Sequence, residues 1–221
     1  MTSAGFLPLA VEGRRLLIRE AAAAAVLLAL AWFFARPALG ALLVITASAM
    51  GFTLFFFREP VFEPDTPESG FILSPSYGTV LGSAVEDGRP VVRIFLSVLD
   101  VHAQYSPVEG RVLRTGFHGS AYAAAFKKEA SANLRNRIDI ELPGGEELGV
   151  EQIAGSIARR ISCPLKPGDG LEPGDRLGLI YFGSQVAVFL PPGAEPLARP
   201  GSRVYPCRTV IGRLNNSDGG N

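Results

Sequence analysis

The chain has 221 residues, which is enough for one domain of ordinary size and an additional segment. Its 21 basic and 21 acidic residues cancel, and it has no basic stripe interleaved with aromatic residues, so we exclude nucleic acid as a partner. Two cysteines, Cys163 and Cys207, are too few for a disulfide framework and favour reduced thiols in the cytoplasm. The hydrophobic fraction of 48% is high for a purely soluble protein.

The strongest hydrophobic signal lies near the N-terminus, in residues 21–57. Two uncharged runs, Ala21–Ala35 and Ala38–Phe57, are separated by Arg36-Pro37. A membrane-spanning helix needs about 20 apolar residues, so the second run is long enough and the first is marginal. We predict a helical hairpin that anchors the chain in a membrane and follows an N-terminal arm at residues 1–20. Insertion of the second run alone, or a buried helical pair in a soluble protein, are the alternatives.

Basic residues flank the predicted hairpin on both sides. Arg14, Arg15 and Arg19 precede it, and Arg58 follows it. Positive residues favour the cytoplasmic side of a membrane, so both ends of the hairpin should lie there. We therefore predict a protein of the cell membrane, with the remainder of the chain on the cytoplasmic side.

The amino-acid composition changes after the hairpin. Residues 58–70 are rich in proline and acidic residues and are predicted to form a linker. Residues 71–221 consist of short β-rich runs separated by turn residues, which predicts a mainly β domain, while Tyr122–Leu134 is predicted to be a helix or an irregular arm. The candidate strands are Gly78–Leu81, Val91–Ser97, Gly110–Thr115, Arg137–Glu141, Leu148–Ala154, Arg176–Tyr181 and Val186–Leu190.

A weak internal repeat supports this fold class. The sequence SPSYGTVL at residues 74–81 resembles SPVEGRVL at residues 106–113, and each is a Pro-Gly turn that leads into a strand. The sequence PGDRLGLI at residues 173–180 is typical of a turn and strand in biotinyl- or lipoyl-like barrels. Together these patterns predict a compact barrel-sandwich.

Common catalytic motifs are missing from the sequence. It contains no phosphate-binding loop, no dinucleotide-binding glycine fingerprint and no Gly-x-Ser-x-Gly elbow. With only two histidines, His102 and His118, a multi-histidine metal centre is excluded and no metal is predicted. Of five Gly-Ser dipeptides, Gly183-Ser184 stands between two strong strand candidates, where a tight turn could strain the peptide bond and aim the hydroxyl at the preceding carbonyl. An ordinary hairpin turn is the alternative.

Five stretches together resemble the short, membrane-anchored phosphatidylserine decarboxylases. They are FFFREP (55–60), LSPSYGTV (73–80), DVHAQYSPVEGRV (100–112), NLRNRIDIE (133–141) and, within 151–193, EQIAGSIARRISC and EPGDRLGLIYFGSQVAVFLPPG. None of these stretches is specific alone, but their order and spacing match the family. The resemblance covers most of the chain from the apolar segment onward.

The resemblance implies a proenzyme that cleaves itself. The hydroxyl of Ser184 would attack the carbonyl of Gly183, cut the chain there and leave a covalent pyruvoyl cofactor at residue 184. The fragments 1–183 and 184–221 would stay associated, and the resemblance leaves a homo-oligomer open. The ketone would condense with the amine of phosphatidylserine, a membrane phospholipid, and accept the electrons released with carbon dioxide, which yields phosphatidylethanolamine.

Further site residues follow from the same resemblance. His102, within the motif Asp-Val-His, is assigned to proton transfer. Four residues in a stretch like the family's polar arm are predicted to bind the lipid phosphate or the substrate carboxylate: Lys128, Asn133, Arg135 and Asn136. A solvated charged face is the alternative for these four residues. His118 matches no motif of the family.

The chain departs from the family at one informative position. The family usually carries an aspartate before the glycine of its Ser-Pro-x-Asp-Gly segment, and this chain has Tyr77 there. In longer members that aspartate orients a catalytic histidine, and a tyrosine is a poor substitute at neutral pH. Three outcomes stay open: slow cleavage, cleavage that uses another carboxylate such as Asp100, or an uncleaved, inactive membrane-anchored β-barrel that binds lipid or a partner protein.

Overall fold

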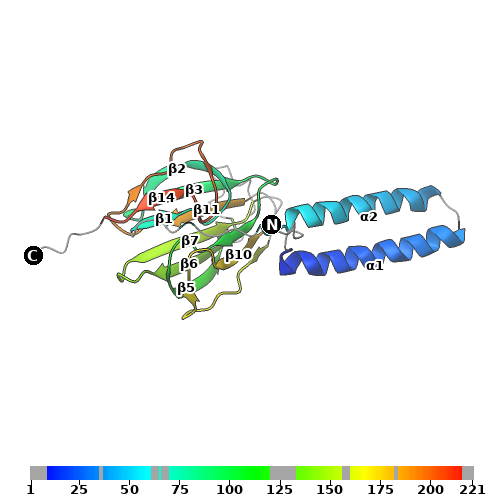
Figure 1. Cartoon of the computed structure of the whole chain (residues 1–221), viewed down its shortest axis with the longest axis horizontal. Coiled ribbons are helices and arrows are strands. Elements are labelled where there is room, and N and C mark those ends of the chain that lie inside the picture. Colours follow the sequence, from blue (N-terminus) through cyan, green and yellow to red (C-terminus); the bar gives the residue numbers. More distant parts are fainter. Residues whose placement is uncertain are drawn as a thin grey trace, which may run out of the picture. The chain divides into compact units, whose positions relative to one another are not determined.

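The computed structural model in Figure 1 describes residues 9–34, 37–60, 65, 70–119, 133–155, 160–181 and 184–215. The chain forms two compact units, Met1–Phe62 and Glu63–Asn221. The first unit contains both described helices, and the second contains all the described strands. The boundary between the units falls inside the linker predicted at residues 58–70.

The first unit is a hairpin of two long helices, α1 (Val11–Phe34) and α2 (Pro37–Phe56). Pro37 suits the first position of α2, because its fixed φ is helical and its missing N–H would have no partner at a helix start. The apolar helical hairpin predicted from the sequence is confirmed. Helix α1 begins at Val11, so the predicted N-terminal arm includes its first turns.

Contacts at the open end of the hairpin hold the two helices in register. The backbone N–H of Ala10 donates to the carbonyl oxygen of Phe57 at 2.9 Å. A Cβ on Gly13 would overlap the Phe57 side chain, so glycine allows the two segments to approach closely. Further along the pair, Oγ1 of Thr53 donates to the carboxylate of Glu20 at 2.9 Å.

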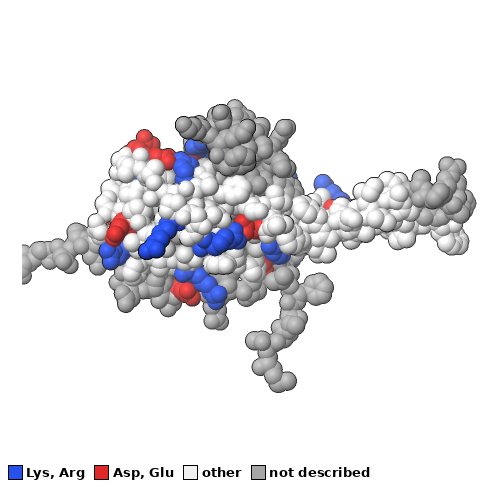
Figure 2. Space-filling view, turned by 90° about the horizontal axis from the view of Figure 1, so that it is seen from above, with Lys and Arg blue, Asp and Glu red and all other residues white. Residues whose placement is uncertain are grey.

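The outer surface of the hairpin is apolar. Val44 and Ile45 of α2 expose 67% and 64% of their surface. The segment Leu39–Phe56 has a mean hydropathy of 2.0 and is long and apolar enough to cross a membrane. On the face seen in Figure 2, the described part of the hairpin carries charge only near one end. A helical pair of a soluble protein would expose polar side chains instead.

The described part of the second unit is built from strands. Each of the seven strands predicted from the sequence overlaps one of them, whereas Tyr122–Leu134 lies almost wholly outside the described residues. The strands are β1 (Phe71–Leu73), β2 (Gly78–Glu86), β3 (Arg89–Leu96), β4 (Ala103–Tyr105), β5 (Gly110–His118), β6 (Arg135–Glu141), β7 (Glu147–Ile153), β8 (Ile161–Ser162), β9 (Gly170–Leu171), β10 (Arg176–Ile180), β11 (Ser184–Phe189), β12 (Glu195–Pro196), β13 (Arg203–Val204) and β14 (Val210–Arg213).

Eight strands form one large antiparallel sheet in the order β13-β2-β3-β11-β7-β6-β5-β9. Two small sheets, β1-β14-β12 and β4-β10-β8, complete the unit. Register shifts after Val80 in β2 and after Val112 in β5 help the large sheet to curl. Apolar side chains on one face of this sheet, among them Ile94, Val150 and Val188, form the core. The predicted mainly β, barrel-like fold is confirmed.

The internal repeat of the sequence is present in the structure as well. Gly78 begins β2 and Gly110 begins β5. A Cβ on Gly78 would lie 2.6 Å from Cγ2 of Ile94, and a Cβ on Gly110 would lie 2.6 Å from Cγ2 of Ile140. Both positions therefore need glycine, because another strand approaches too closely for a side chain. The two hairpins β2–β3 and β5–β6 are thus built alike.

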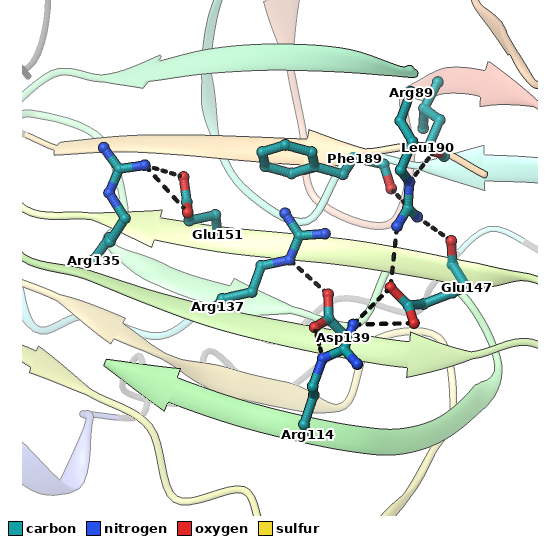
Figure 3. A network of polar contacts seen from close by, with 9 residues as sticks. All are labelled: Arg89, Arg114, Arg135, Arg137, Asp139, Glu147, Glu151, Phe189 and Leu190. Carbon is teal, nitrogen blue, oxygen red and sulfur yellow. Dashed lines mark hydrogen bonds and ion pairs between the residues drawn. The ribbon is translucent and has the colours of Figure 1, made fainter. Parts of the chain in front are cut away.

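The second face of the large sheet carries a network of ion pairs (Figure 3). Arg137 on β6 donates to the carboxylate of Asp139 at 2.6 Å, and its guanidinium lies 3.8 Å from the centroid of the Phe189 ring on β11. A Cβ on Gly149 of β7 would overlap this guanidinium, so glycine lets the arginine cross the strand. Arg114 on β5 joins Asp139 at 2.6 Å. The network therefore ties together four neighbouring strands.

Candidate active site

Ser184 occupies the first position of β11, a central strand of the large sheet. Its side chain is fully buried, and its backbone is in register with Leu96 at the end of β3. Oγ of Ser184 has no hydrogen-bond partner among the described residues. Buried hydroxyl groups in proteins are almost always hydrogen-bonded, so this one is a candidate for a chemical role. Gly183, the other residue of the predicted cleavage bond, lies outside the described residues.

The imidazole of His102 is fully buried and has a defined orientation. Nδ1 of His102 lies 2.8 Å from the backbone oxygen of Asp100. Because a carbonyl oxygen only accepts hydrogen bonds, Nδ1 carries the hydrogen, and Nε2 is then the basic nitrogen of the neutral ring. This arrangement suits a residue that takes up and returns a proton.

Two backbone contacts bring Ser184 and His102 to the same end of the second unit. The register of β11 and β3 places Ser184 opposite Leu96, and the turn that follows Leu96 leads directly to His102. The backbone N–H of Ile180, four residues before Ser184, donates to the carbonyl oxygen of His102 at 3.1 Å. Ser184 and His102, two of the three residues assigned to catalysis from the sequence, therefore lie next to the two ends of one short turn.

Asp100 fixes this turn with its carboxylate. Oδ2 accepts a hydrogen bond from the backbone N–H of Ser97 at 2.9 Å, and Oδ1 lies 2.6 Å from Nη2 of Arg203 on β13. The hydrogen bond to Asp100 is the main cause of the raised pKa of Arg203. Tyr77, at the position where the resemblance predicts aspartate, makes an edge-on contact with the ring of Tyr205, with centroids 5.9 Å apart.

A chain of fully buried amide side chains runs from His102 into the large sheet, and we call Gln104, Gln152 and Asn136 the amide chain. Nε2 of Gln104 donates to the carbonyl oxygen of His102 at 2.6 Å. Nε2 of Gln152 donates to Oε1 of Gln104 at 2.7 Å, and Nδ2 of Asn136 donates to Oε1 of Gln152 at 2.9 Å. All three amides are fully buried.

Sequence reasoning missed Gln104 and Gln152. The available signal was the alternation of β7, where Leu148 and Val150 face the core and Gln152 takes the next position on that face. A glutamine at a core-facing position of a strand must find hydrogen bonds inside the protein, which marks it as a candidate for a buried network.

Ser184 and the amide chain share the core-facing side of the large sheet. Side chains alternate along a strand, so Ser184 points to the same side as Val186. The register pairs Val186 with Gln152, and Gln152 with Asn136. Ser184 is thus a diagonal neighbour of Gln152, at a separation of about 7–8 Å typical of such pairs. The buried amide chain therefore lies on the same side of the sheet as the side chain at the start of β11.

Two of the residues predicted to bind lipid lie at or beyond the edge of the described residues. Lys128 is outside them. Asn133 is fully buried, and its Nδ2 donates to the carbonyl oxygen of Ala154 at 2.7 Å, next to the end of β7. This contact fixes the segment that enters β6. A role of Asn133 in binding the substrate stays a prediction.

The other two predicted lipid-binding residues are neighbours on β6 and point to opposite faces of the sheet. Asn136 faces the core as part of the amide chain. Arg135 faces the other way, and its Nη1 lies 3.1 Å from the carboxylate of Glu151 (Figure 3). The structure therefore brings Asn136, and not Arg135, to the side of Ser184. Substrate contacts of either residue stay predictions.

Burial raises the pKa of both thiols. Cys207 is fully buried, its Sγ donates to the backbone oxygen of Ser106 at 3.4 Å, and its pKa is raised to about 12. Burial also raises the pKa of Cys163, against smaller opposing effects of the Leu165 backbone and the Asn136 side chain. Protonated thiols are poor nucleophiles. Within the described residues, no three histidine, cysteine or acidic side chains are grouped so that they could hold a metal ion.

Comparison with protein families gives independent information about this site. A sequence model of the family described as phosphatidylserine decarboxylase matches residues 50–212. The matched stretch includes Ser184, His102 and the amide chain.

Curated relatives are similar over most of their length, and each is named phosphatidylserine decarboxylase proenzyme. The relative from Gluconacetobacter diazotrophicus is 40% identical over 216 residues, which cover 91% of this chain and 92% of the relative. The one from Gluconobacter oxydans is 41% identical over 174 residues, covering 74% and 77%. The one from Symbiobacterium thermophilum is 41% identical over 199 residues, covering 86% and 91%.

Proposed function

Because the chain belongs to the phosphatidylserine decarboxylase family, whose enzymes are carboxy-lyases, we propose that it converts phosphatidylserine to phosphatidylethanolamine with a pyruvoyl group made from Ser184. The observation that carries this proposal is the buried hydroxyl of Ser184, which has no hydrogen-bond partner among the described residues and begins a central strand. The relatives are named proenzymes, which agrees with processing of the chain.

Self-cleavage starts at the hydroxyl of Ser184. Its Oγ attacks the carbonyl carbon of Gly183, the bond from that carbon to the Ser184 nitrogen breaks, and the chain is joined by an ester. Loss of the α-proton of Ser184 expels the carboxylate of Gly183 and leaves a dehydroalanine. Water then replaces the nitrogen, which departs as ammonia, and residue 184 ends as a ketone. The products are the fragments 1–183 and 184–221.

His102 is the residue we assign to the proton transfers. Its Nδ1 donates to the Asp100 backbone, which leaves Nε2 to take the proton from Oγ of Ser184. The same nitrogen can later return a proton to the α-carbon of the substrate. Asp100 and Arg203 hold the turn that carries the imidazole, so their ion pair supports the reaction indirectly.

The surroundings of Ser184 fit a pyruvoyl group. The residue is fully buried, and no hydrogen bond among the described residues ties its Oγ to the fold, so its loss leaves no partner unsatisfied. A ketone in this place supplies the electron sink for the electrons released with carbon dioxide. β11 pairs with β3 and β7, so fragment 184–221 stays bound to the larger fragment after cleavage.

The helical hairpin would hold the enzyme at its substrate. Leu39–Phe56 could anchor the chain in a membrane, and phosphatidylserine does not leave the bilayer. A tether to the same surface raises the effective concentration of substrate at the site. Arginines in the first turns of α1 and just after α2 favour the cytoplasmic face of the cell membrane for both ends of the hairpin.

A second function is favoured by one observation. Tyr77 replaces the family aspartate and packs against Tyr205. If no other group replaces that carboxylate, the chain would be an uncleaved, membrane-anchored barrel that binds lipid or a partner protein. The backbone oxygen of Asp100 orients His102, and the relatives are named proenzymes, so self-cleavage is the better supported function.

Mass spectrometry of the purified full-length protein and of Ser184→Ala tests the proposed function. The wild type should give two chains, the smaller being fragment 184–221 with a blocked N-terminus, and should release carbon dioxide from carboxyl-labelled phosphatidylserine in vesicles. Ser184→Ala should give one intact chain and no carbon dioxide. Decarboxylation by the intact chain would overturn the proposal, and an intact, inactive wild type that binds vesicles would support the second function.

A further inference from the structure

The two halves of the second unit correspond strand by strand. The first half consists of β1 to β3 and β11 to β14. The second half consists of β4 to β6, which correspond to β1 to β3, and of β7 to β10, which correspond to β11 to β14. Read from either end, the large sheet therefore has corresponding strands in the same order. Hydrogen bonds recur as well. The N–H of Gly201 donates to the carbonyl oxygen of Val80 at 2.8 Å, and the N–H of Gly168 donates to that of Val112 at 2.8 Å. Residues of one half therefore have counterparts in the other.

Gln104 has an apolar counterpart. In the small sheets, Gly178 of β10 is paired with Gln104 of β4, and Gly212 of β14 is paired with Ile72 of β1. These are equivalent strands of the two halves. Gln104 therefore occupies the place that Ile72 occupies in the other half, and both side chains are fully buried.

The same two glycines identify the counterpart of Gln152. A Cβ on Gly178 would lie 2.9 Å from Nε2 of Gln152, and a Cβ on Gly212 would lie 2.9 Å from Cδ1 of Leu190. Each glycine thus leaves room for a buried side chain of the large sheet. Gln152 occupies the place of Leu190.

Asn136, the third amide, also has an apolar counterpart. Asn136 pairs with Gln152 in the large sheet. In the other half, the carbonyl oxygen of Pro90 accepts from the N–H of Leu190 at 2.8 Å, so Pro90 is the counterpart of Asn136. The other half therefore has apolar side chains in these three places, two of them fully buried, so the fold itself does not require amides. An unmatched buried polar group costs about 1–3 kcal/mol, which makes such a network a liability unless it has a use.

The amide chain has one direction. The carbonyl oxygen of His102 only accepts, so Gln104 must donate with Nε2 and accept with Oε1. The same constraint passes to Gln152 and then to Asn136. The chain ends at Oδ1 of Asn136, which is buried and has no hydrogen-bond partner among the described residues. The carbonyl group of His102 thus orients three amides, and they fix that carbonyl in return.

The amides occur in the half of the fold that contains the catalytic histidine. The counterpart of His102 is Gly70. The N–H of Leu214 donates to the carbonyl oxygen of Gly70 at 2.7 Å, and the N–H of Ile180 donates to the carbonyl oxygen of His102 in the same way. We propose that the amide chain positions the main chain of His102, and with it the imidazole, for proton transfer at Ser184. This inference rests on the proposed self-cleavage.

A triple variant with apolar side chains in all three places tests the inference. Gln104→Ile and Gln152→Leu copy Ile72 and Leu190, and Asn136→Val replaces the third amide. The carbonyl oxygen of His102 still accepts from the N–H of Ile180, and Cys163 loses only its weak contact with Asn136, so the protein should fold with a melting temperature near that of the wild type. Cleavage during cell-free synthesis should slow by roughly tenfold or more, and each tenfold corresponds to 1.36 kcal/mol of barrier. Once cleaved, the variant should show a lower kcat with little change in KM. The control, Ile72→Leu with Leu190→Met, alters the counterpart places and should cleave at the wild-type rate.

If the triple variant fails to fold, Gln152→Glu tests whether the amide chain positions His102. The introduced carboxyl has the same shape and still accepts from Asn136, but once ionised it cannot donate to Gln104. Cleavage should therefore slow as the pH rises between about 5 and 9, the range in which a buried carboxyl ionises. Among the described residues, His102 and Cys163 are the ionisable groups in contact with the amide chain, and both are kept, so the wild type measured in parallel subtracts their effect.

Two results would overturn the inference. One is a folded triple variant that cleaves as fast as the wild type. The other is Gln152→Glu cleaving with the pH profile of the wild type. Failure of the proposed function is distinguishable, because then the wild type itself stays intact or Ser184→Ala is still cut.

Discussion

Nδ1 of His102 and the backbone oxygen of Asp100 are 2.8 Å apart, so this aspartate orients the histidine with its main chain. Its carboxylate is engaged elsewhere, by Arg203 and by the backbone of Ser97. Asp100 can therefore contribute to the site without taking the geometric place of the aspartate that the resemblance predicts at the position of Tyr77. The position of the imidazole then depends on how firmly Arg203 holds the turn.

Loss of Arg203 should loosen this turn and slow cleavage. Arg203→Leu leaves the Asp100 carboxylate, which is only 7% exposed, without its counter-charge. Because Arg203 is itself half exposed, we expect a loss of about 1 kcal/mol in the free energy of unfolding. The measurements are urea unfolding and the time course of cleavage during synthesis.

Arg213→Leu is the matched control for Arg203→Leu. Arg213 pairs with Glu195 at 2.7 Å, and both side chains are about half exposed. Such a pair contributes about 0.5 kcal/mol or less, and it lies on the small sheet away from His102. Equal effects of the two variants on cleavage would show that the turn is not held by Arg203.

The hairpin and the long strands could be predicted from the sequence because their signals are local. Two uncharged runs define α1 and α2, and short β-rich runs bounded by turn residues locate strands such as β3 and β7. Strands of two or three residues, such as β8 and β13, were missed, because so short a segment has no period. These short segments are extended because a neighbouring strand forms hydrogen bonds with them.

The candidate site could be predicted only in part. Ser184 and His102 were predicted from their motifs, which are contiguous in the sequence, and their catalytic roles stay predictions. The amide chain was not found, because its members come from three strands and form a network only after the chain has folded. A buried glutamine in one strand gives no indication of which other strand satisfies it.

Two glycines should respond to alanine in very different ways. A Cβ on Gly178 would overlap the backbone oxygen of Ser162, which cannot move without breaking the pairing of β8 with β10. A Cβ on Gly149 would overlap only the guanidinium of Arg137, which can swing away. We expect Gly178→Ala to cost about 3 kcal/mol or more and Gly149→Ala about 1 kcal/mol, the latter including the lost contact with Phe189.

Urea unfolding of both alanine variants checks this contrast. Gly149→Ala should retain cleavage at the wild-type rate, since Arg137 lies on the face of the sheet opposite Ser184. Gly178→Ala should lower cleavage along with stability, since it presses on Gln152. A larger loss of stability for Gly149→Ala would contradict the assignment.

A charge in the middle of α2 should release the protein from membranes. Val44 is 67% exposed on the hairpin surface, within the segment Leu39–Phe56. An arginine near the centre of a spanning helix costs about 2.5–3.5 kcal/mol on insertion scales. Val44→Arg should therefore move protein from the membrane fraction to the soluble fraction, whereas Val44→Leu should not. Unchanged membrane recovery of Val44→Arg after alkaline washing would argue against insertion of α2.

Cys207 should make stability depend on pH in the alkaline range. Burial raises its pKa from the ordinary value of 9.0 to about 12, so the folded state holds the thiol proton more tightly than the unfolded state does. Below pH 9 both states are protonated and the full contribution to stability is present. Between pH 9 and about 12 the unfolded chain loses the proton first, so the free energy of unfolding falls with rising pH by at most about 1.4 kcal/mol per pH unit.

Cys207→Ala removes this contribution and leaves the rest of the chain unchanged. Alanine keeps the Cβ, so the positive φ of 54° at this position strains both proteins alike. Urea unfolding at intervals from about pH 8 to pH 10.5 should give curves that converge as the pH rises, because only the wild type carries the thiol. Parallel curves would mean that the Cys207 thiol ionises equally easily in the folded and unfolded states. In that case the burial that keeps this thiol inert would have to be reconsidered.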